Sequence, residues 1–385
     1  MKKILIVNNN MHIGGIQKSL VNLLGEIKNR YDITLLLLCD IGELRGSIPA
    51  GVRVIGAGAA LRTLGMTHAE AKMDGALTFL VRSVLVVLTR LFTTRLTFAL
   101  LTKSFRAPGE YDAAISYMQN DDKRIFYGGC AELVLNSVKS REKICFVHSD
   151  FKSFAGNNAY NIGILKKFDK IATVSDSAAE RLIMAAPGLA GKVRTVHNCI
   201  NYDEIARLKD EYSPQLSGGV KLFTAARLHH EKGILRMLPV LKRIKEAGAD
   251  FVWYVAGDGP DKAEAVRLIS EYGLGREVVL LGNLVNPYPY FYRADILLVP
   301  SYEEAAPMVF GEAEALGTYI FSTRTASAEE LVSGRGIGTV CENTDDAIER
   351  ELLKVIENFS PHKYAASKAD NSRCVAEFDA LIGRE

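Results

Sequence analysis

The chain has 385 residues, a formal net charge of +2, 24% charged residues and 48% hydrophobic residues. This length predicts about two domains, each large enough to bury its own core, in an ordinary soluble globular protein. No domain-wide excess of basic residues occurs, so nucleic acid is not an expected partner. The six cysteines lack the spacing of a zinc site, which predicts buried free thiols, a reducing compartment and no bound metal.

The N-terminus predicts a strand and not a signal peptide. Only four apolar residues, 4–7, precede the polar residues 8–10. No stretch reaches the roughly 18 uncharged residues that a membrane-spanning helix requires. We therefore expect a cytoplasmic protein.

The first half of the chain alternates short apolar runs with helical patterns, which predicts a doubly wound parallel sheet. Gly14 and Gly15 lie where the first strand leads into a helix, so their amides could receive an anion or a sugar, although a tight turn would need the same residues. His148 ends another strand, at the sheet edge where such folds bind ligands. A solitary histidine is more often structural. The expected strands are 4–7, 33–38, 52–55, 111–117, 143–148 and 171–174.

Residues 76–105 combine many leucines and phenylalanines with charges of one sign. The segment contains Arg82, Arg90, Arg95 and Lys103, and no acidic residue occurs between positions 74 and 110. Helices of this kind suit the surface of an anionic membrane. The alternative is a pair of buried helices whose arginine heads reach solvent at their ends. Because all the charges are positive, residues 76–106 favour an anionic membrane surface as a partner, with peripheral attachment to its inner face.

The second half predicts another sheet, after a polar linker over 201–219. A strand beginning at residue 221 leads into a loop that bears Arg227 and Lys232. Two cations at a strand end could neutralise a diphosphate without a metal, although two surface charges would look the same. Further strands are expected at 251–256, 278–282, 294–300 and 319–322.

Two of the glutamates in residues 301–317, Glu304 and Glu312, bracket the end of a buried strand and the start of a helix. Pro307 and Gly317 suit the start and the end of a helix over 307–316, which leaves Glu304 in the connecting loop. Glu312 shares the apolar stripe of that helix and should point inward, where a carboxylate needs hydrogen-bonding partners. Those partners could be backbone amides or a buried arginine, but the strand-end location favours a ligand. Glu314, on another face, should need no explanation.

The spacing Glu304-x7-Glu312 resembles the signature of retaining nucleotide-sugar glycosyltransferases with the GT-B fold, family 4, also called glycosyl transferases group 1. The resemblance implies that Glu312 holds the ribose hydroxyls of a nucleotide and that Glu304 lies near the donor sugar. The backbone amides of Met308 and Val309 would face the sugar and the diphosphate. Residues 305–307 depart from the family, because Ala-Ala-Pro replaces its flexible glycine-containing run.

The resemblance extends to other loops. The Gly14-Gly15 loop is similar to the family's glycine pair near the reacting centre, with Gln17 where a glutamate is usual. His148 matches a strand-end histidine near the donor sugar. Arg227 and Lys232 match the pair that stabilises the departing diphosphate. No separate base is identifiable, as expected if the leaving phosphate takes the acceptor proton.

The resemblance implies two Rossmann-like, doubly wound α/β domains with a cleft between them. Residues 1–200 would bind the acceptor and 220–361 the nucleotide sugar, while 362–385, with a helix over 366–382, would pack back on the first domain. The expected activity is metal-independent hexosyl transfer from a nucleotide-diphosphate sugar, with no cofactor. The acceptor would be a saccharide or a polyprenyl-linked saccharide of a bacterial surface polysaccharide.

Two other functions fit the same residues. A nucleotide-sugar epimerase also uses two such domains, but it needs an acid/base pair around the sugar. A non-catalytic protein that binds nucleotide sugars or a membrane surface would explain the departures at residues 305–307 and at Cys199, which replaces a family glycine.

Overall fold

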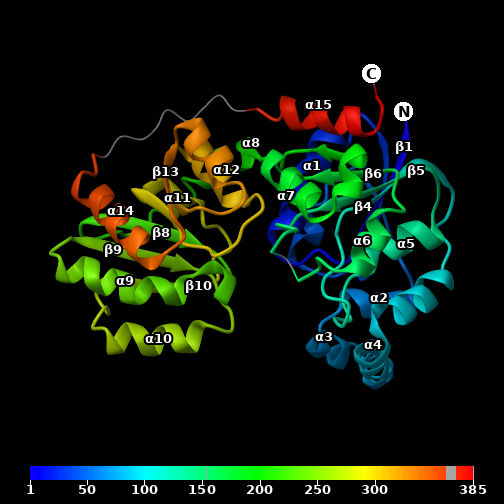
Figure 1. The fold of residues 1–385 in the computed structure, drawn as a ribbon, viewed down its shortest axis with the longest axis horizontal. Helices are drawn as coiled ribbons and strands as arrows, with labels where there is room; N and C mark the ends of the chain where they lie inside the picture. The colour runs from blue at the N-terminus through cyan, green and yellow to red at the C-terminus, as the bar shows by residue number, and fades with distance from the viewer. Residues whose placement is uncertain (154, 361–369, 385) are drawn as a thin grey trace. The chain divides into compact units, whose positions relative to one another are not determined.

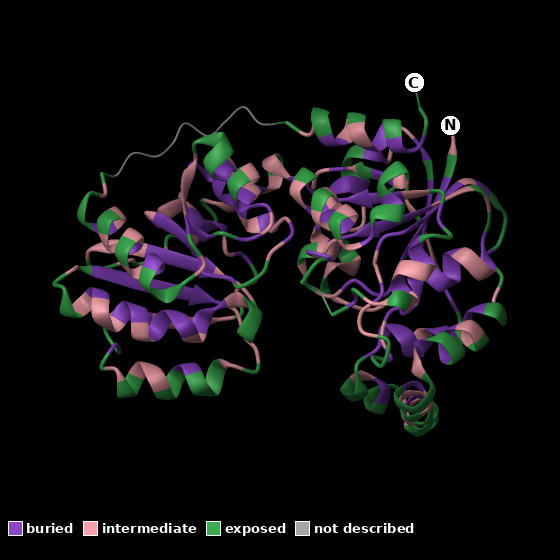
Figure 2. Cartoon of the chain, viewed as in Figure 1, coloured by how far each residue is buried: buried purple, intermediate pink, exposed green. Residues whose placement is uncertain are grey.

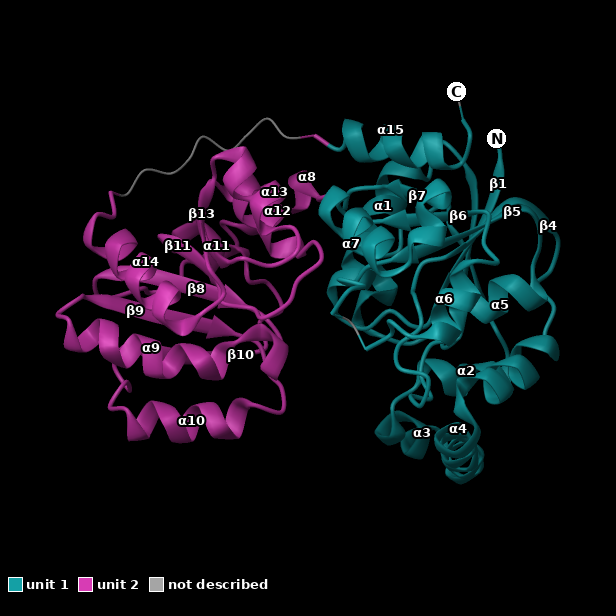
Figure 3. Ribbon diagram, viewed as in Figure 1, with its two compact units in different colours: residues 1–199, 371–385 teal, residues 200–370 magenta. Residues whose placement is uncertain are grey.

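The computed structural model describes residues 1–153, 155–360 and 370–384. The chain divides into two compact units. The first unit comprises residues 1–199 and 371–385, and the second comprises residues 200–370 (Figures 1 and 3). Each unit is built around one parallel sheet that is buried between helices, as the purple strands in Figure 2 show.

The sheet of the first unit has seven parallel strands in the order β3-β2-β1-β4-β5-β6-β7. Strand order reverses between β1 and β4, because the chain first builds outward to β3 and then returns to the other side of β1. Apolar side chains fill both faces of β1, as expected for a parallel strand covered by helices on each side. The strands are β1 Lys3–Asn8, β2 Asp32–Leu37, β3 Arg53–Gly56, β4 Glu110–Ser116, β5 Lys139–Val147, β6 Lys170–Thr173 and β7 Val193–Thr195.

The helices of the first unit cover both faces of this sheet. They are α1 Gly15–Ile27, α2 Ala59–Arg62, α3 His68–Asp74, α4 Ala76–Lys103, α5 Cys130–Ser137, α6 Ala159–Leu165, α7 Asp176–Ala185 and α15 Ser372–Leu381, with 3-10 turns at Glu43–Ser47, Thr63–Gly65 and Pro187–Lys192. The last helix, α15, packs beside α1, where the rings of Tyr31 and Phe378 meet edge to face and the Tyr31 hydroxyl donates to Asp379.

The second unit holds six parallel strands in the order β10-β9-β8-β11-β12-β13, with the reversal between β8 and β11. Its strands are β8 Val220–Ala225, β9 Phe251–Ala256, β10 Val278–Gly282, β11 Ile296–Val299, β12 Tyr319–Thr323 and β13 Gly338–Cys341. Its helices are α8 Tyr202–Leu208, α9 Ile234–Glu246, α10 Lys262–Glu271, α11 Tyr288–Arg293, α12 Met308–Leu316, α13 Ala328–Leu331 and α14 Asp345–Glu357, with 3-10 turns at His230–Lys232 and Ser333–Arg335.

The expected α/β fold class is confirmed, whereas several local details differ. The predicted linker contains the helix α8, and β13 was not predicted. The expected last helix begins at Ser372, and residues 361–369 lie outside the described residues. The expectation that every cysteine is a free thiol is wrong, because Cys199 and Cys374 form a disulfide with a Cα–Cα distance of 6.1 Å.

The sequence was expected to contain no membrane-spanning helix. By length and composition alone, however, α4 is long and apolar enough to cross a membrane. The helix is broken at Thr93, whose φ of 66° and ψ of 169° are not helical. The hydroxyls of Thr89 and Thr97 lie 2.8 Å apart, although residues eight apart in a straight helix are separated by about 12 Å. The chain therefore turns sharply, and its longer half, residues 76–92, is about 25 Å long. That length falls short of the roughly 30 Å hydrocarbon core of a bilayer.

Candidate functional site

The candidate donor site lies where strand order reverses in the second unit. Arg227 and Lys232 follow β8, and Glu304 follows its neighbour β11. Loops that leave two strands in opposite directions open a crevice at the carboxyl edge of an α/β sheet, and ligands bind in such crevices. The topology therefore brings together residues 227, 232 and 304, which are separated by up to 77 positions in sequence.

Two glycines let the loop after β8 pack closely on its neighbours. Gly233 has a φ of 69°, and a Cβ atom there would lie 2.1 Å from the carbonyl oxygen of Pro300, at the end of β11. A Cβ on Gly257 would lie 1.9 Å from the carbonyl oxygen of Ala226. Only glycine fits such positions, so the loop is fixed on each side of Arg227 and Lys232.

Lys232 and Glu304 form a direct ion pair. The Lys232 ammonium lies 2.8 Å from Glu304 Oε1, and the Ser301 hydroxyl donates to the same oxygen over 2.9 Å. Both side chains are largely buried. The Arg227 side chain is exposed and makes no ion pair among the described residues. One cation is therefore already oriented by a carboxylate, and the other is open to an anionic ligand.

The helix α12 buries two carboxylates, Glu312 and Glu314. Glu312 is 3% exposed, so its predicted inward direction is confirmed. Glu314 is also buried and pairs with Arg335 over 2.6 Å, which corrects the expectation that it lies on an unremarkable face. Glu314 is thus paired with a cation of its own domain.

The start of α12 exposes backbone donors toward the strand edge. Pro307 is the N-cap, one residue before the helix, with a φ of −67° and no side-chain cap. Met308 and Val309 are therefore the first helical residues, whose amides have no carbonyl partner within the helix. Gly317 ends the helix in the left-handed region, as its position predicted. The helix start is suited to receive negative charge.

In the first unit, the corresponding reversal lies between β1 and β4. Gly14 is the extended N-cap residue of α1, and Gly15 begins the helix with an exposed backbone. The loop before them is held by buried asparagines: Asn10 donates to the carbonyl of Gly65 over 2.7 Å and to the Tyr127 hydroxyl over 3.0 Å. Gln17 is buried and lies 3.5 Å from Asn9 Oδ1.

His148 directly follows β5 at the same edge. Its ring packs on Tyr117 and Phe146, with centroids 4.8 and 5.7 Å away, and Gln119 accepts a hydrogen bond from its backbone amide. Burial lowers the pKa of His148 to about 4, against a smaller opposing effect of a hydrogen bond to the backbone of Tyr117. The imidazole is therefore neutral at pH 7. Its buried Nε2 makes no hydrogen bond within the described residues and can accept one from a hydroxyl.

Sequence reasoning missed the residues that support these side chains. Ser301 orients Glu304, and the ring of Tyr302 stacks on His230 while Arg236 lies over its face. Asn10 and Tyr127 tie the β1 loop to the segment before α5. Ser301 and Tyr302 lie within the recognised 301–317 stretch and His230 lies between Arg227 and Lys232, whereas Tyr127 comes from a loop distant in sequence.

Comparison with known proteins relates the second half of the chain to a family. Residues 211–372 match the family model described as glycosyl transferases group 1. The chain carries a glycosyl transferases group 1 domain. The matched range contains Arg227, Lys232, Glu304 and Glu312, so the whole candidate donor site lies in that domain.

Curated relatives of this glycosyl transferase domain include three enzymes of different biology. The chain is 30% identical over 185 residues to 2-deoxystreptamine glucosyltransferase of Streptomyces kanamyceticus, covering 47% of this chain and 44% of that one. It is 24% identical over 245 residues to the gpi3 subunit of phosphatidylinositol N-acetylglucosaminyltransferase of Schizosaccharomyces pombe, covering 61% and 52%. It is 24% identical over 253 residues to the N-acetylgalactosamine-N,N'-diacetylbacillosaminyl-diphospho-undecaprenol 4-alpha-N-acetylgalactosaminyltransferase of Campylobacter jejuni, covering 63% and 65%. The match spans about half the length of the first two.

Solved structures confirm the GT-B fold of the chain that carries this glycosyl transferase domain. The Anabaena HepE structure with UDP and glucose is similar over 100% of both chains, with a TM-score of 0.72 and 16% identity. The apo lipopolysaccharide outer core galactosyltransferase WaaB covers 100% of this chain and 99% of its own, with a TM-score of 0.64 and 15% identity.

Proposed function

We propose that the protein is a retaining glycosyltransferase that moves a hexosyl group from a nucleotide-diphosphate sugar to a saccharide or lipid-linked saccharide acceptor. The single observation that carries the proposal is the Lys232–Glu304 pair at the strand-order reversal of the second unit, beside the unpaired Arg227. A cation that faces a site carboxylate and a second cation that faces solvent suit a bound diphosphate whose charge grows as it leaves.

In the proposed reaction, the bond between the sugar C1 and the diphosphate oxygen breaks. The acceptor hydroxyl forms a new bond to C1 on the same face, and its proton passes to the departing phosphate oxygen. Arg227 and Lys232 stabilise the negative charge that develops on that oxygen. This arrangement performs the charge neutralisation without a metal ion.

We assign the remaining donor contacts from the family resemblance, and the burial and polarity of these residues are compatible with it. Glu312, held inside the domain at 3% exposure, accepts hydrogen bonds from the ribose hydroxyls. The Met308 and Val309 amides at the start of α12 receive the diphosphate or the sugar, and Glu304 orients the sugar. In the first unit, neutral His148 accepts a hydrogen bond from a sugar hydroxyl. The backbone amides of Gly14 and Gly15 donate hydrogen bonds to the groups at the reacting centre.

We also propose that the first unit docks peripherally on the inner face of an anionic membrane through α4. The burial of this helix is inverted: its buried residues are Arg82, four threonines and Phe98, while Leu77, Leu80, Val84, Val87, Leu91, Phe92, Leu96 and Leu100 are exposed. An exposed apolar face of this extent is unusual for a soluble surface. The exposed Arg95 and Lys103 supply attraction to anionic lipids. A location at the membrane suits a lipid-linked acceptor that is used in the synthesis of a bacterial surface polysaccharide.

Calorimetric titration with a panel of nucleoside diphosphates and their sugars tests the donor site. We expect one nucleotide to bind, and Arg227→Ala and Glu312→Ala to abolish binding. Transfer with that donor should give product of unchanged anomeric configuration by NMR, and EDTA should not slow it. Absence of nucleotide binding would overturn the proposal, and isomerisation of the sugar nucleotide without acceptor would identify an epimerase instead.

A further inference from the structure

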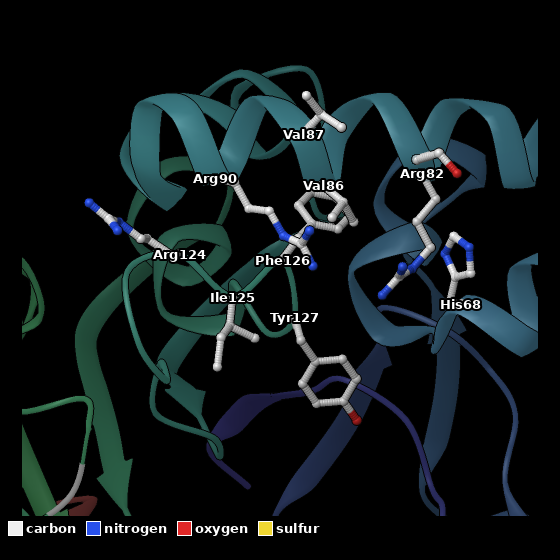
Figure 4. Close-up of a pocket in the computed structure, with 10 residues that line it drawn as sticks. His68, Arg82, Val86, Val87, Arg90, Arg124, Ile125, Phe126 and Tyr127 are labelled. Carbon is white, nitrogen blue, oxygen red and sulfur yellow. The ribbon is translucent and has the colours of Figure 1, made fainter.

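The first unit contains a pocket of about 560 Å³ beneath α4. Its wall is formed by α4 from Arg82 to Arg90, by His68 at the start of α3, and by residues 124–127, which precede α5 (Figure 4). This volume is within the range of small-molecule sites. None of the residues assigned to the donor site belongs to it.

The lining of this pocket carries positive charge and no carboxylate. Arg82, Arg90 and Arg124 contribute three guanidinium groups, and Val86, Ile125 and Phe126 contribute apolar surface. Figure 4 shows Arg90 extending from α4 toward the 124–127 loop. A site with several arginines and no acid is suited to phosphate oxygens, which accept paired hydrogen bonds from the guanidinium fork.

Arg82 is the decisive residue because it is 8% exposed. Its Nε donates to the carbonyl of Met66 over 3.0 Å, and its guanidinium carbon lies 5.8 Å from the centre of the Phe126 ring. Its two terminal nitrogens make no hydrogen bond within the described residues. The nearby Glu70 is already engaged, since its oxygens contact His12 Nε2 and the Thr67 amide, each over 2.6 Å. A buried cation whose terminal nitrogens have no carboxylate hydrogen-bonded to them within the described residues is suited to bind an anion.

The pocket also connects two parts of the first unit. On one side α4 turns Leu80, Val84 and Leu91 outward, away from the protein interior. On the other side Tyr127 lines the pocket and its hydroxyl accepts a hydrogen bond from Asn10, in the loop that leads to Gly14. A ligand in the pocket would thus have an apolar surface at one end and the β1 loop at the other.

We propose that this pocket binds the diphosphate of a lipid-carried saccharide acceptor, with the lipid chain along the outer face of α4 and the sugar toward the β1 loop. The proposal rests on the proposed glycosyl transfer for the identity of the ligand as an acceptor. The diphosphate contacts Arg82, Arg90 and Arg124, and no bond is made or broken at this site.

Flotation of the full-length protein with vesicles tests the proposal. Three compositions are used: phosphatidylcholine alone, phosphatidylcholine with 30% phosphatidylglycerol, and phosphatidylcholine with a small fraction of polyprenyl diphosphate. The test variant is R90Q/R124Q, which removes two exposed charges that line the pocket. The matched control is R95Q/K103Q, which removes two exposed charges from the same helix outside the pocket.

We expect R90Q/R124Q to weaken binding to polyprenyl diphosphate vesicles at least tenfold, and R95Q/K103Q to weaken it no more than about twofold. Equal loss in both variants would show diffuse surface attraction and overturn the pocket. Binding to phosphatidylglycerol vesicles with no preference for polyprenyl diphosphate would overturn the proposal that the pocket binds an acceptor. It would show instead that the pocket binds an ordinary anionic membrane lipid. Nucleotide binding is measured in parallel: if it is absent while the diphosphate lipid binds, the proposed transfer fails and the lipid site stands.

Discussion

Two helices of this protein, α12 and α4, turn polar side chains toward the interior, but they differ in what they expose. In α12 the inward Glu314 is paired with Arg335, while Glu312 lies at a strand edge where a ligand would sit. In α4 the buried positions hold Arg82, Phe98 and threonines, while most of the leucines and valines that pack on no core residue, such as Leu80 and Leu91, face outward. A helix in water buries its apolar face, so α12 departs from that rule at its two buried glutamates, whereas α4 buries an arginine and exposes many of its apolar side chains.

The difference shows how a ligand-binding site can be distinguished from a membrane-docking surface. An inward carboxylate just after the carboxyl end of a strand, on a helix that otherwise packs normally, indicates a local ligand, because the surrounding packing is retained. An inverted helix indicates that the environment outside it is apolar, because removing its outer face from water gains free energy. The two features predict a soluble donor nucleotide at α12 and a membrane at α4.

Lys232→Met should have the largest effect, because it removes the cation nearest Glu304 and leaves that carboxylate without its partner. We expect kcat to fall on the order of 10²- to 10³-fold, since charge stabilisation of a leaving group is lost. Steady-state transfer assays measure the loss. Lys262→Met is the control, because Lys262 pairs with Asp258 on the exposed surface, and its kcat should match wild type. A wild-type kcat in Lys232→Met would show that Lys232 does not stabilise the leaving group, and the proposed donor site would lose its support.

The double substitution Leu80→Ser and Leu91→Ser tests the other half. These side chains are 61% and 69% exposed, so folding stability should change by less than about 0.5 kcal/mol per site. Vesicle binding should fall about 100-fold, because each leucine contributes roughly 1.5 kcal/mol when it enters lipid. Met184→Ser with Val266→Ser, equally exposed on α7 and α10, is the matched control. Equal vesicle binding by both double variants would show that α4 is not a docking face.

The sequence predicted the sheets and the strand-end positions of Arg227, Lys232 and Glu304 because each depends on local patterns. Apolar runs marked most of the strands, and strand ends marked Arg227, Lys232 and Glu304. The pairing of Glu314 with Arg335 could not be predicted, because Arg335 lies in a 3-10 turn 21 residues later. The disulfide between Cys199 and Cys374 joins residues 175 apart, and the spacing of the cysteines gave no indication of it. The position of the break at Thr93 could not be predicted, because threonine rarely adopts a positive φ.

Glu312→Gln and Glu314→Gln form a matched pair on α12. We expect Glu312→Gln to raise the donor KM about tenfold, since it weakens charged hydrogen bonds to the ligand, and to change Tm less than Glu314→Gln does. Glu314→Gln should instead lower stability by about 1–2 kcal/mol, because Arg335 keeps its charge beside a neutral amide, and the donor KM should stay near wild type. Thermal unfolding and initial-rate kinetics on both variants measure the difference. Identical behaviour of the two would show that Glu312 is also structural.

The smallest expected effect concerns His148, an inward polar group at the end of β5. Its folded pKa of about 4 lies below the ordinary 6.5, so between these values the unfolded chain binds a proton that the folded chain does not. Stability from this residue is therefore complete above pH 6.5 and is lost as the pH falls toward 4. Urea unfolding of His148→Asn from pH 7.5 to 4.5 should show a shallower loss than wild type. At pH 7.5 the histidine is neutral in both states, so the difference there reports packing alone. If the two profiles run parallel below pH 6.5, His148 does not titrate as a buried neutral group, and its proposed role as a hydrogen-bond acceptor at neutral pH loses its basis.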